Sequence, residues 1–189
     1  MKLDKIRDLV FLNVSYWAAL SGTQMTLLPI HMVSPTFNLG PSEIGASFVL
    51  MSVSSLIASQ PVAYIADRYG KVNVILAGCS TVSLGMFAIP VATTYEQLLL
   101  SLIPLALGSS MMGSTPRAQI ASITSAEERS QASSLLQAGG DVGLFAGAIF
   151  SGFCAQFLSI ETTMAINGSF LLLALSSYSM KSYRDAKKK

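Results

Sequence analysis

This chain of 189 residues contains long stretches without a charged residue, and these stretches limit the folds that it can adopt. No Asp, Glu, Lys or Arg occurs between Asp8 and Glu43 or between Lys71 and Glu96, and four other stretches contain at most one charge. A helix needs roughly 20 apolar residues to cross a bilayer. Lipid cannot hydrogen-bond the backbone and these stretches lack the alternation of barrel strands, so each is expected to be a membrane-spanning helix. The six predicted helices cover about residues 9–33, 44–66, 72–93, 97–119, 130–156 and 162–180.

The composition excludes a soluble domain. Hydrophobic residues make up 51% of the chain and charged residues 12%, against about 25% charged in a typical soluble domain. No domain-sized hydrophilic segment remains outside the six stretches, so residues 1–189 are expected to form a single all-α transmembrane domain. No cluster of metal-ligating residues is apparent, so neither a metal nor a cofactor is expected. The net charge of +2 resides at the membrane edges and predicts no nucleic-acid partner.

The positions of Lys and Arg predict an orientation. All 12 of them lie at the two ends of the chain or beside the second and fourth connections. The first, third and fifth connections contain Glu43, Glu96 and Glu161 as their only charged residues. Since cytoplasmic loops retain Lys and Arg, both termini of this multi-pass protein are expected in the cytoplasm. An even number of spans agrees with that placement.

Two connections carry helix-start signals. Gly40-Pro41-Ser42-Glu43 precedes the second helix, and Ser42 is the expected N-cap. Ser125 is followed three residues later by Glu128, the spacing of a capping box at the start of the fifth helix.

Polar side chains within the predicted helices indicate a cavity or a tightly packed bundle core. Asp141 lies deep in the fifth helix, where an unpaired Asp costs about 2.5–3.5 kcal/mol on insertion scales. It is either a site of proton or cation coupling or a carboxyl group held by polar groups of a neighbouring helix. Arg117 has three candidate partners: a phosphate headgroup, a carboxylate or the cavity. The candidate coupling or substrate-cavity residues are Asn13, Gln24, Gln60, Arg117, Gln137 and Asp141.

Three glycines in the fifth helix point to close helix packing. Gly139, Gly143 and Gly147 are four residues apart, which places them nearly on one face of the helix. Small faces of this kind let two helix backbones approach closely in lipid. They are expected to serve packing rather than chemistry.

The segment after the second helix, Ala-Tyr-Ile-Ala-Asp-Arg-Tyr-Gly-Lys at residues 63–71, resembles the signature loop of the major facilitator superfamily. That signature has Gly, three residues, Asp-Arg, any residue, Gly and then basic residues; an Ala replaces the first Gly here. The stretch from Gly108 to Gly113, followed by Pro116-Arg117, is similar to the family's passage from helix four to helix five. The resemblance implies a cytoplasmic gating loop formed by Ala63, Asp67, Arg68, Gly70 and Lys71.

Members of this family usually have twelve helices, arranged as two six-helix halves around a substrate site at mid-membrane. The resemblance therefore implies half of a secondary transporter that works by alternating access. Pro104 stands where many N-terminal halves carry a basic residue, which favours a C-terminal half. The expected activity is proton- or cation-coupled efflux of a small neutral or lipophilic solute. The expected partners are the bilayer, the solute and a second six-helix half, from the same chain, a second copy or another protein.

The alternative is a non-transporting membrane regulator, an adaptor or a truncated remnant of the same fold. An intramembrane enzyme is not expected. An intramembrane serine protease needs a Ser–His pair within the membrane, but the chain's single histidine, His31, lies at the outer end of the first helix. An intramembrane aspartyl protease needs two facing aspartates, but no second membrane Asp accompanies Asp141.

Overall fold

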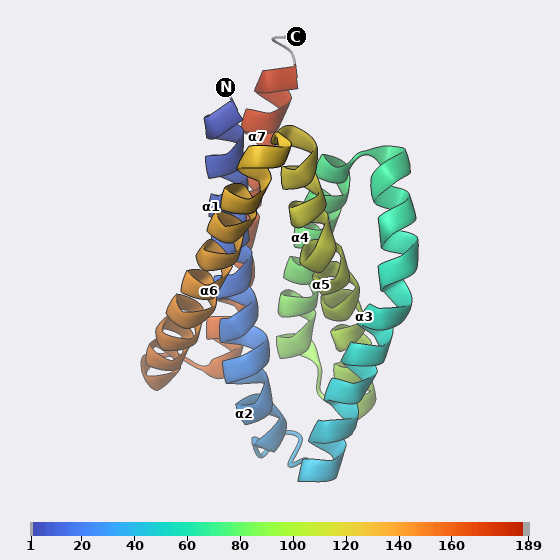
Figure 1. The fold of residues 1–189 in the computed structure, drawn as a ribbon. Helices are drawn as coiled ribbons and strands as arrows, with labels where there is room; N and C mark the ends of the chain where they lie inside the picture. The colour runs from blue at the N-terminus through green and yellow to red at the C-terminus, as the bar shows by residue number, and fades with distance from the viewer. Residues whose placement is uncertain (1, 187–189) are drawn as a thin grey trace.

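The computed structural model describes residues 2–186, which within that range form helices and short connections (Figure 1). The predicted all-α class is confirmed. The elements join end to end into six rods, the first of which is α1–η1–α2 and the third α4–η2. In chain order they are α1 (Lys2–Leu20), the π-helical η1 (Ser21–Leu27), α2 (Leu28–Val33), α3 (Pro41–Tyr69), α4 (Lys71–Ala88), the 3-10 helical η2 (Ile89–Val91), α5 (Tyr95–Ile123), α6 (Ala126–Phe157) and α7 (Ile160–Ala186).

Caps, rather than the nearest charges, decide where the helices begin. Gly40 is the N-cap of α3, and its N–H donates to the Glu43 carboxylate at 2.9 Å. The expectation that Ser42 is the cap was wrong because Pro41 takes the first helical position, where its missing N–H leaves no bond unmade. The capping box of Ser125 and Glu128 at the start of α6 is confirmed.

The junction between α3 and α4 is a single glycine rather than a loop. Asp67 and Arg68 lie in the last turn of α3, and Lys71 is the first residue of α4. Gly70 between the two helices has a φ of +92°, a conformation that costs other residues strain. The predicted gating loop is therefore a sharp helix–Gly–helix corner.

Four helices among residues 2–186 are long and apolar enough to cross a membrane: α3, α4 with η2, α5 and α6. Six spans were expected. The first rod is divided by its π-helical segment, and α1 begins with five charged residues among Lys2–Asp8. In α7, serines and Asn167 dilute the apolar residues.

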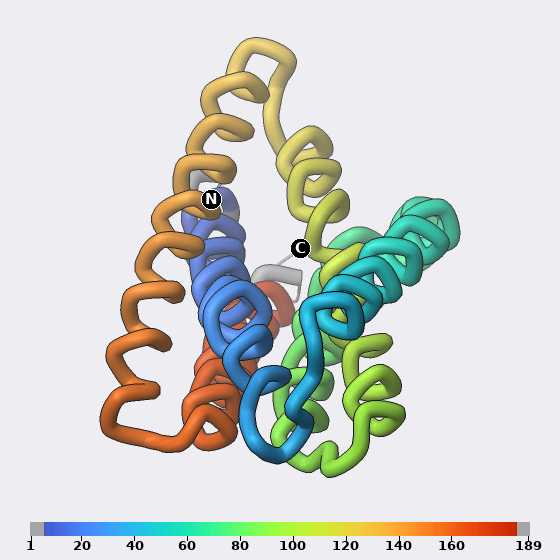
Figure 2. Tube along the Cα trace, turned by 90° about the horizontal axis from the view of Figure 1, so that it is seen from below, coloured from blue at the N-terminus to red at the C-terminus, as the bar shows by residue number. Residues whose placement is uncertain are grey.

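The rods pack unequally. α1 packs on α6 and α7, α4 packs on α5 and α7, and α3 packs mainly on α5. α6 and α3 lie on opposite outer sides of the bundle in both views (Figures 1 and 2). The start of α1, the α3–α4 corner, the α5–α6 turn and the end of α7 share one end of the bundle, called here the terminal end (Figure 1).

A stripe of small residues fixes α6 against α1. A Cβ atom on Gly143 would meet the carbonyl oxygen of Val14, and one on Gly147 would meet that of Ala18. On Gly139 it would lie 3.0 Å from the Val10 side chain. All three predicted packing glycines therefore face α1. The buried residues of the stripe recur every three or four positions: Ala132, Leu136, Gly140, Gly143, Gly147 and Ser151.

Candidate functional site

A hydrogen-bonded chain of three side chains joins α5 to α6. Arg117 Nη2 donates to Gln137 Oε1 at 2.7 Å, and Gln137 Nε2 donates to Asp141 Oδ1 at 3.0 Å. Gln137 and Asp141 are one turn apart on α6, so both point to the same side of that helix. A neutral amide thus connects a guanidinium and a carboxylate, and all three residues are exposed at the surface of the bundle. We call this set the Arg–Gln–Asp chain.

The Arg–Gln–Asp chain rests on a buried anchor from α1. Asn13 Nδ2 donates to the carbonyl oxygen of Leu136, the residue before Gln137, at 2.9 Å. Asn13 and Trp17 line a hollow of about 20 Å³ together with Arg117 and Gln137, which is room for about one water molecule. Three helices therefore meet at this site, and four of the six predicted cavity residues lie in it or at its edge.

The other two predicted cavity residues lie elsewhere. Gln24 is on η1 and lines a separate cavity between η1, α3 and α5. Gln60 is exposed on α3, next to Pro61.

The predicted gating residues are all on the outer side of the α3–α4 corner. Ala63, Asp67 and Arg68 are exposed, and Lys71 is half-buried. Arg68 Nη1 donates to the Tyr64 hydroxyl at 3.4 Å, and its guanidinium lies 5.7 Å from the centre of the Tyr69 ring. Among the described residues, Asp67 forms no ion pair. The charged end of α3 therefore presents its side chains outward from the bundle.

A buried polar network holds η1 in place, and the sequence analysis did not identify it. Asn167 Nδ2 on α7 donates to Thr23 Oγ1 at 3.1 Å and to Ser151 Oγ on α6 at 3.0 Å. Ser21 Oγ donates to the carbonyl oxygen of Leu144 at 2.5 Å. Each of these residues looked like an ordinary polar position in a helix. The residues of η1 lie more than 100 residues from their partners on α6 and α7, so no local sequence pattern could pair them.

A titratable pair lies at the end of the bundle opposite the termini. His31 in α2 is 2% exposed, and its Nδ1 is 3.5 Å from Glu161 Oε1 at the start of α7. The pKa of Glu161 is lowered by its backbone hydrogen bond, and also by the Ser159 hydroxyl and by His31, against a smaller opposing effect of burial. The ionised carboxylate is therefore the form that the fold favours.

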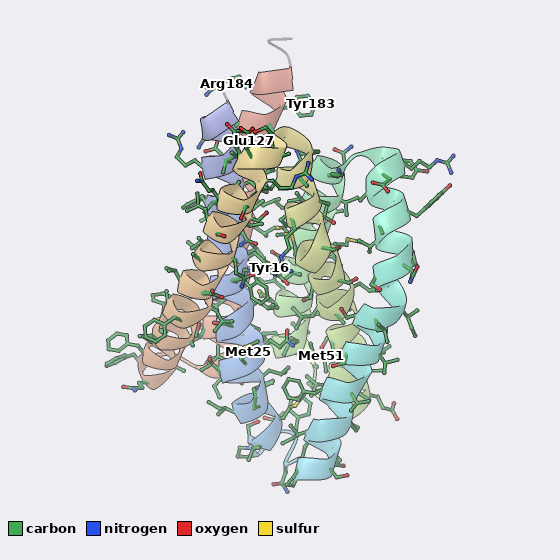
Figure 3. The ribbon with its side chains drawn as sticks, viewed as in Figure 1. Tyr16, Met25, Met51, Glu127, Tyr183 and Arg184 are labelled. Carbon is green, nitrogen blue, oxygen red and sulfur yellow. The ribbon has the colours of Figure 1, made fainter. Side chains whose placement is uncertain are left out.

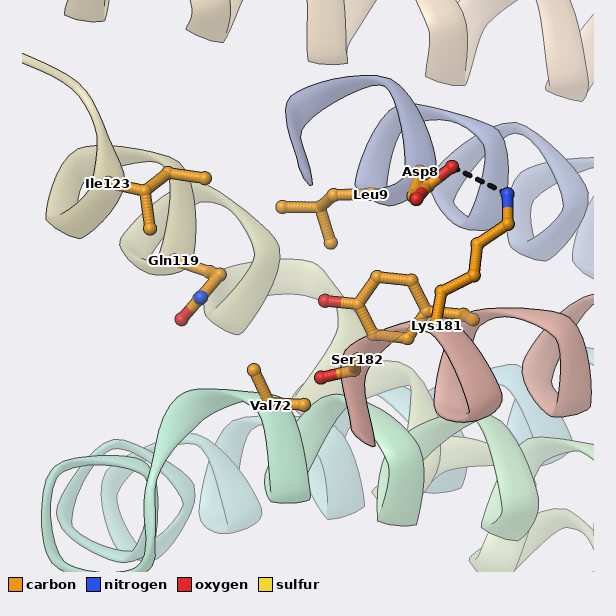
Figure 4. A pocket seen from close by; sticks show the side chains of 8 residues that line it. Asp8, Leu9, Val72, Gln119, Ile123, Lys181 and Ser182 are labelled. Atoms are coloured by element: carbon orange, nitrogen blue, oxygen red, sulfur yellow. Dashed lines mark hydrogen bonds and ion pairs between the residues drawn. The ribbon is translucent and has the colours of Figure 1, made fainter. Parts of the chain in front are cut away.

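At the terminal end an ion pair ties the first rod to the last. Lys181 Nζ is 2.8 Å from Asp8 Oδ1, at the edge of a pocket of about 90 Å³ between α1, α4, α5 and α7 (Figure 4). The Asp8 side chain is 17% exposed and that of Lys181 is 51% exposed, so the pair is partly shielded from solvent.

Comparison with known proteins places this helical bundle in a family. A profile described as Major Facilitator Superfamily matches residues 10–189, almost the whole chain. The chain belongs to the major facilitator superfamily. A curated relative, an uncharacterized MFS-type transporter of Methanocaldococcus jannaschii, is 24% identical over 143 residues. The match covers 75% of this chain and 37% of the relative, so the chain spans little more than a third of that protein's length.

Membership in the major facilitator superfamily places the helical bundle in a membrane. A major facilitator protein is an integral membrane protein of a family that moves small molecules across membranes, and the apolar helices of this member agree with that location. The predicted family and the predicted location in a membrane are therefore confirmed.

Proposed function

We propose that this major facilitator protein is one six-helix half of a proton- or cation-coupled secondary transporter. It would carry a small neutral or lipophilic solute outward by alternating access. The Arg–Gln–Asp chain is the observation that supports coupling, since it places an exposed carboxylate where protonation changes a contact between two helices.

The chemistry of the Arg–Gln–Asp chain explains how a proton would be transmitted. Ionised Asp141 only accepts hydrogen bonds, so the Gln137 NH₂ group faces it and the Gln137 oxygen faces Arg117. Protonated Asp141 also donates, and the amide can then turn its oxygen toward the acid. Arg117 loses its acceptor in that step, and the α5–α6 contact weakens. A bound cation at Asp141 would compete with the same amide.

A second bundle is required because alternating access moves one bundle against another around a shared site. The outer faces of α3 and α6 support such a partner, or lipid, because large apolar side chains there are at least 46% exposed: Val49, Val53, Leu56, Ile57, Val142, Phe145, Ile149 and Phe153. The arrangement of the rods supports six spans with both termini in the cytoplasm, because the Lys- and Arg-flanked turns share the terminal end.

The coupling proposal is tested in lipid vesicles that hold the protein with its second half and a pH-sensitive dye. Addition of neutral solutes one at a time should change the internal pH with at least one of them. Asp141→Asn should abolish the pH change while leaving solute exchange measurable, and Gln137→Leu should reduce it because the amide link to Arg117 is lost. Gln131→Leu, at an exposed glutamine six residues before Gln137 on α6, is the matched control and should behave as wild type.

An unchanged pH response in Asp141→Asn would remove Asp141 from the mechanism. If the wild-type protein with its second half moves none of the solutes tested, the alternative is favoured: a regulator, an adaptor or a remnant of the same fold.

A further inference from the structure

A second polar cavity lies apart from the Arg–Gln–Asp chain. It has a volume of about 240 Å³ and opens between η1, α3 and α5. Figure 3 shows the side of the bundle where η1 and α3 face each other, with Met25 and Met51 labelled. The cavity is lined by Gln24, Phe48, Met51, Ser52, Ser55, Ala106 and Ser109. We call it the Gln24 cavity.

The Gln24 cavity lies halfway along two helices that can span a membrane. Ser55 is the midpoint of α3 (Pro41–Tyr69), and Ser109 is the midpoint of α5 (Tyr95–Ile123). Side chains at this depth are far from both aqueous surfaces. A polar group there must find a partner in the protein, in a water-filled cavity or in a ligand.

Several polar groups in the Gln24 cavity have hydrogen-bonding capacity left over. The half-buried Gln24 amide and the Ser55 hydroxyl make no hydrogen bond to another of residues 2–186. The Ser52 and Ser109 hydroxyls donate to carbonyl oxygens of their own helices, at 2.9 and 2.7 Å. The Ser109 hydroxyl also bonds the Tyr16 side chain, whereas the Ser52 oxygen is left free to accept. The cavity therefore offers both donors and acceptors to an occupant.

Hydrogen bonds from other residues hold the η1 backbone that carries Gln24. Its neighbour Thr23 is fully buried and accepts the hydrogen bond from Asn167, and Thr26 Oγ1 donates to the Ser21 carbonyl oxygen at 3.2 Å within the π-helical turn. Turns of this kind inside α-helices occur frequently at functional sites. The Gln24 side chain is thus presented to the cavity by a segment held on its other side.

The lining contains no charged side chain, and Phe48, Met51 and Ala106 supply apolar surface. An ion entering here would lose its hydration without a compensating charge. We propose that the Gln24 cavity binds a small uncharged solute that carries hydroxyl or amide groups and an apolar face. The volume lies below the roughly 300–1,000 Å³ of sites for drug-sized ligands, which favours a solute about the size of a sugar. This inference rests on the proposed transport function and narrows its solute class.

A different hollow would suit a purely lipophilic solute. It has a volume of about 320 Å³ and lies between α1, α6 and α7, lined by Ala18, Gly147, Phe150 and Phe170 among others. Its polar side chain, Asn167, is already bonded to Thr23 and Ser151. That hollow offers apolar surface but little hydrogen-bonding capacity. It would therefore suit a lipophilic solute, whereas the Gln24 cavity would suit a polar uncharged one.

Binding to the chain in lipid nanodiscs tests the inference. The panel holds neutral hexoses, hexitols and small neutral amides, with gluconate and glucosamine as charged analogues and methylcyclohexane as an apolar analogue. We expect at least one neutral member to bind more tightly than its charged and apolar analogues. Gln24→Leu should weaken that binding about tenfold, the loss expected for about one hydrogen bond left unmade. Ser55→Ala, which removes only one hydroxyl group, should weaken it severalfold, and Gln131→Leu should leave it unchanged.

Three results would overturn the inference: no binding by any neutral member, preferred binding of a charged or apolar analogue, or neutral binding that both cavity variants leave intact. The proton measurements on Asp141→Asn involve neither cavity variant. If no neutral solute binds as expected, the coupling proposal is unaffected. If Asp141→Asn shows no effect on coupling, the binding result is unaffected.

Discussion

At the scale of single residues, charged side chains in this protein are balanced by specific neighbours. Gln137 connects Arg117 to Asp141, and Lys181 is paired with Asp8. The position of Asp141 was sufficient to single it out from the sequence, because a charge deep in an apolar stretch is costly. Its link to Arg117 was not predictable, since the two residues are on different helices and the contact depends on how those helices pack.

The Glu161 carboxylate, held mainly by its backbone hydrogen bond at the start of α7, predicts a pH dependence of stability. The lowered pKa of Glu161 means that its carboxylate stabilises the fold above the ordinary value of 4.5, and that this contribution is lost as the pH falls below it. Glu161→Gln should therefore lower the Tm at pH 7, and the difference from wild type should shrink below pH 4.5. Thermal unfolding in detergent across pH 3.5–7 measures this. A constant difference across the range would contradict the assigned role.

At the scale of helices, the charge-free stretches predicted where the rods lie, and local caps at Gly40, Thr94 and Ser125 placed the starts of α3, α5 and α6 a few residues earlier than predicted. The π-helical turn η1 was not predictable. It is held by Asn167, which lies 144 residues from Thr23, so its cause is tertiary. The sharpness of the α3–α4 corner has a local cause, because Gly70 alone turns the chain while Asp67 and Arg68 remain helical. The gating role of these residues stays a prediction.

The glycine stripe of α6 gives a prediction at this scale. Gly147→Ala should destabilise the protein by about 1–3 kcal/mol, because its new methyl group would overlap the Ala18 carbonyl oxygen and push α6 away from α1. Gly152→Ala, on the same helix with nothing within 4 Å of the added atom, should leave the Tm unchanged or raise it. Thermal unfolding of both variants in the same detergent makes the comparison. Equal losses would show that the stripe does not set the α1–α6 distance.

At the scale of the whole molecule, the packing leaves α3 and α6 as two outer helices with open apolar faces, while α1, α4, α5 and α7 hold most of the buried core. The two polar sites lie on different helix sets: the Arg–Gln–Asp chain uses α1, α5 and α6, and the Gln24 cavity uses η1, α3 and α5. Both depend on α5. A movement of α5 would therefore change both sites together, as coupled transport requires.

The proposed transport mechanism requires that all six rods cross the bilayer with both termini on the cytoplasmic side. Reporter tags inserted singly at residues 34–40, 92–94 and 158–159, and a fourth at the C-terminus, measure it in intact cells. We expect the three internal reporters to be reached from outside and the C-terminal reporter not to be. An internal reporter found on the same side as the C-terminus would show that the six-span topology is wrong.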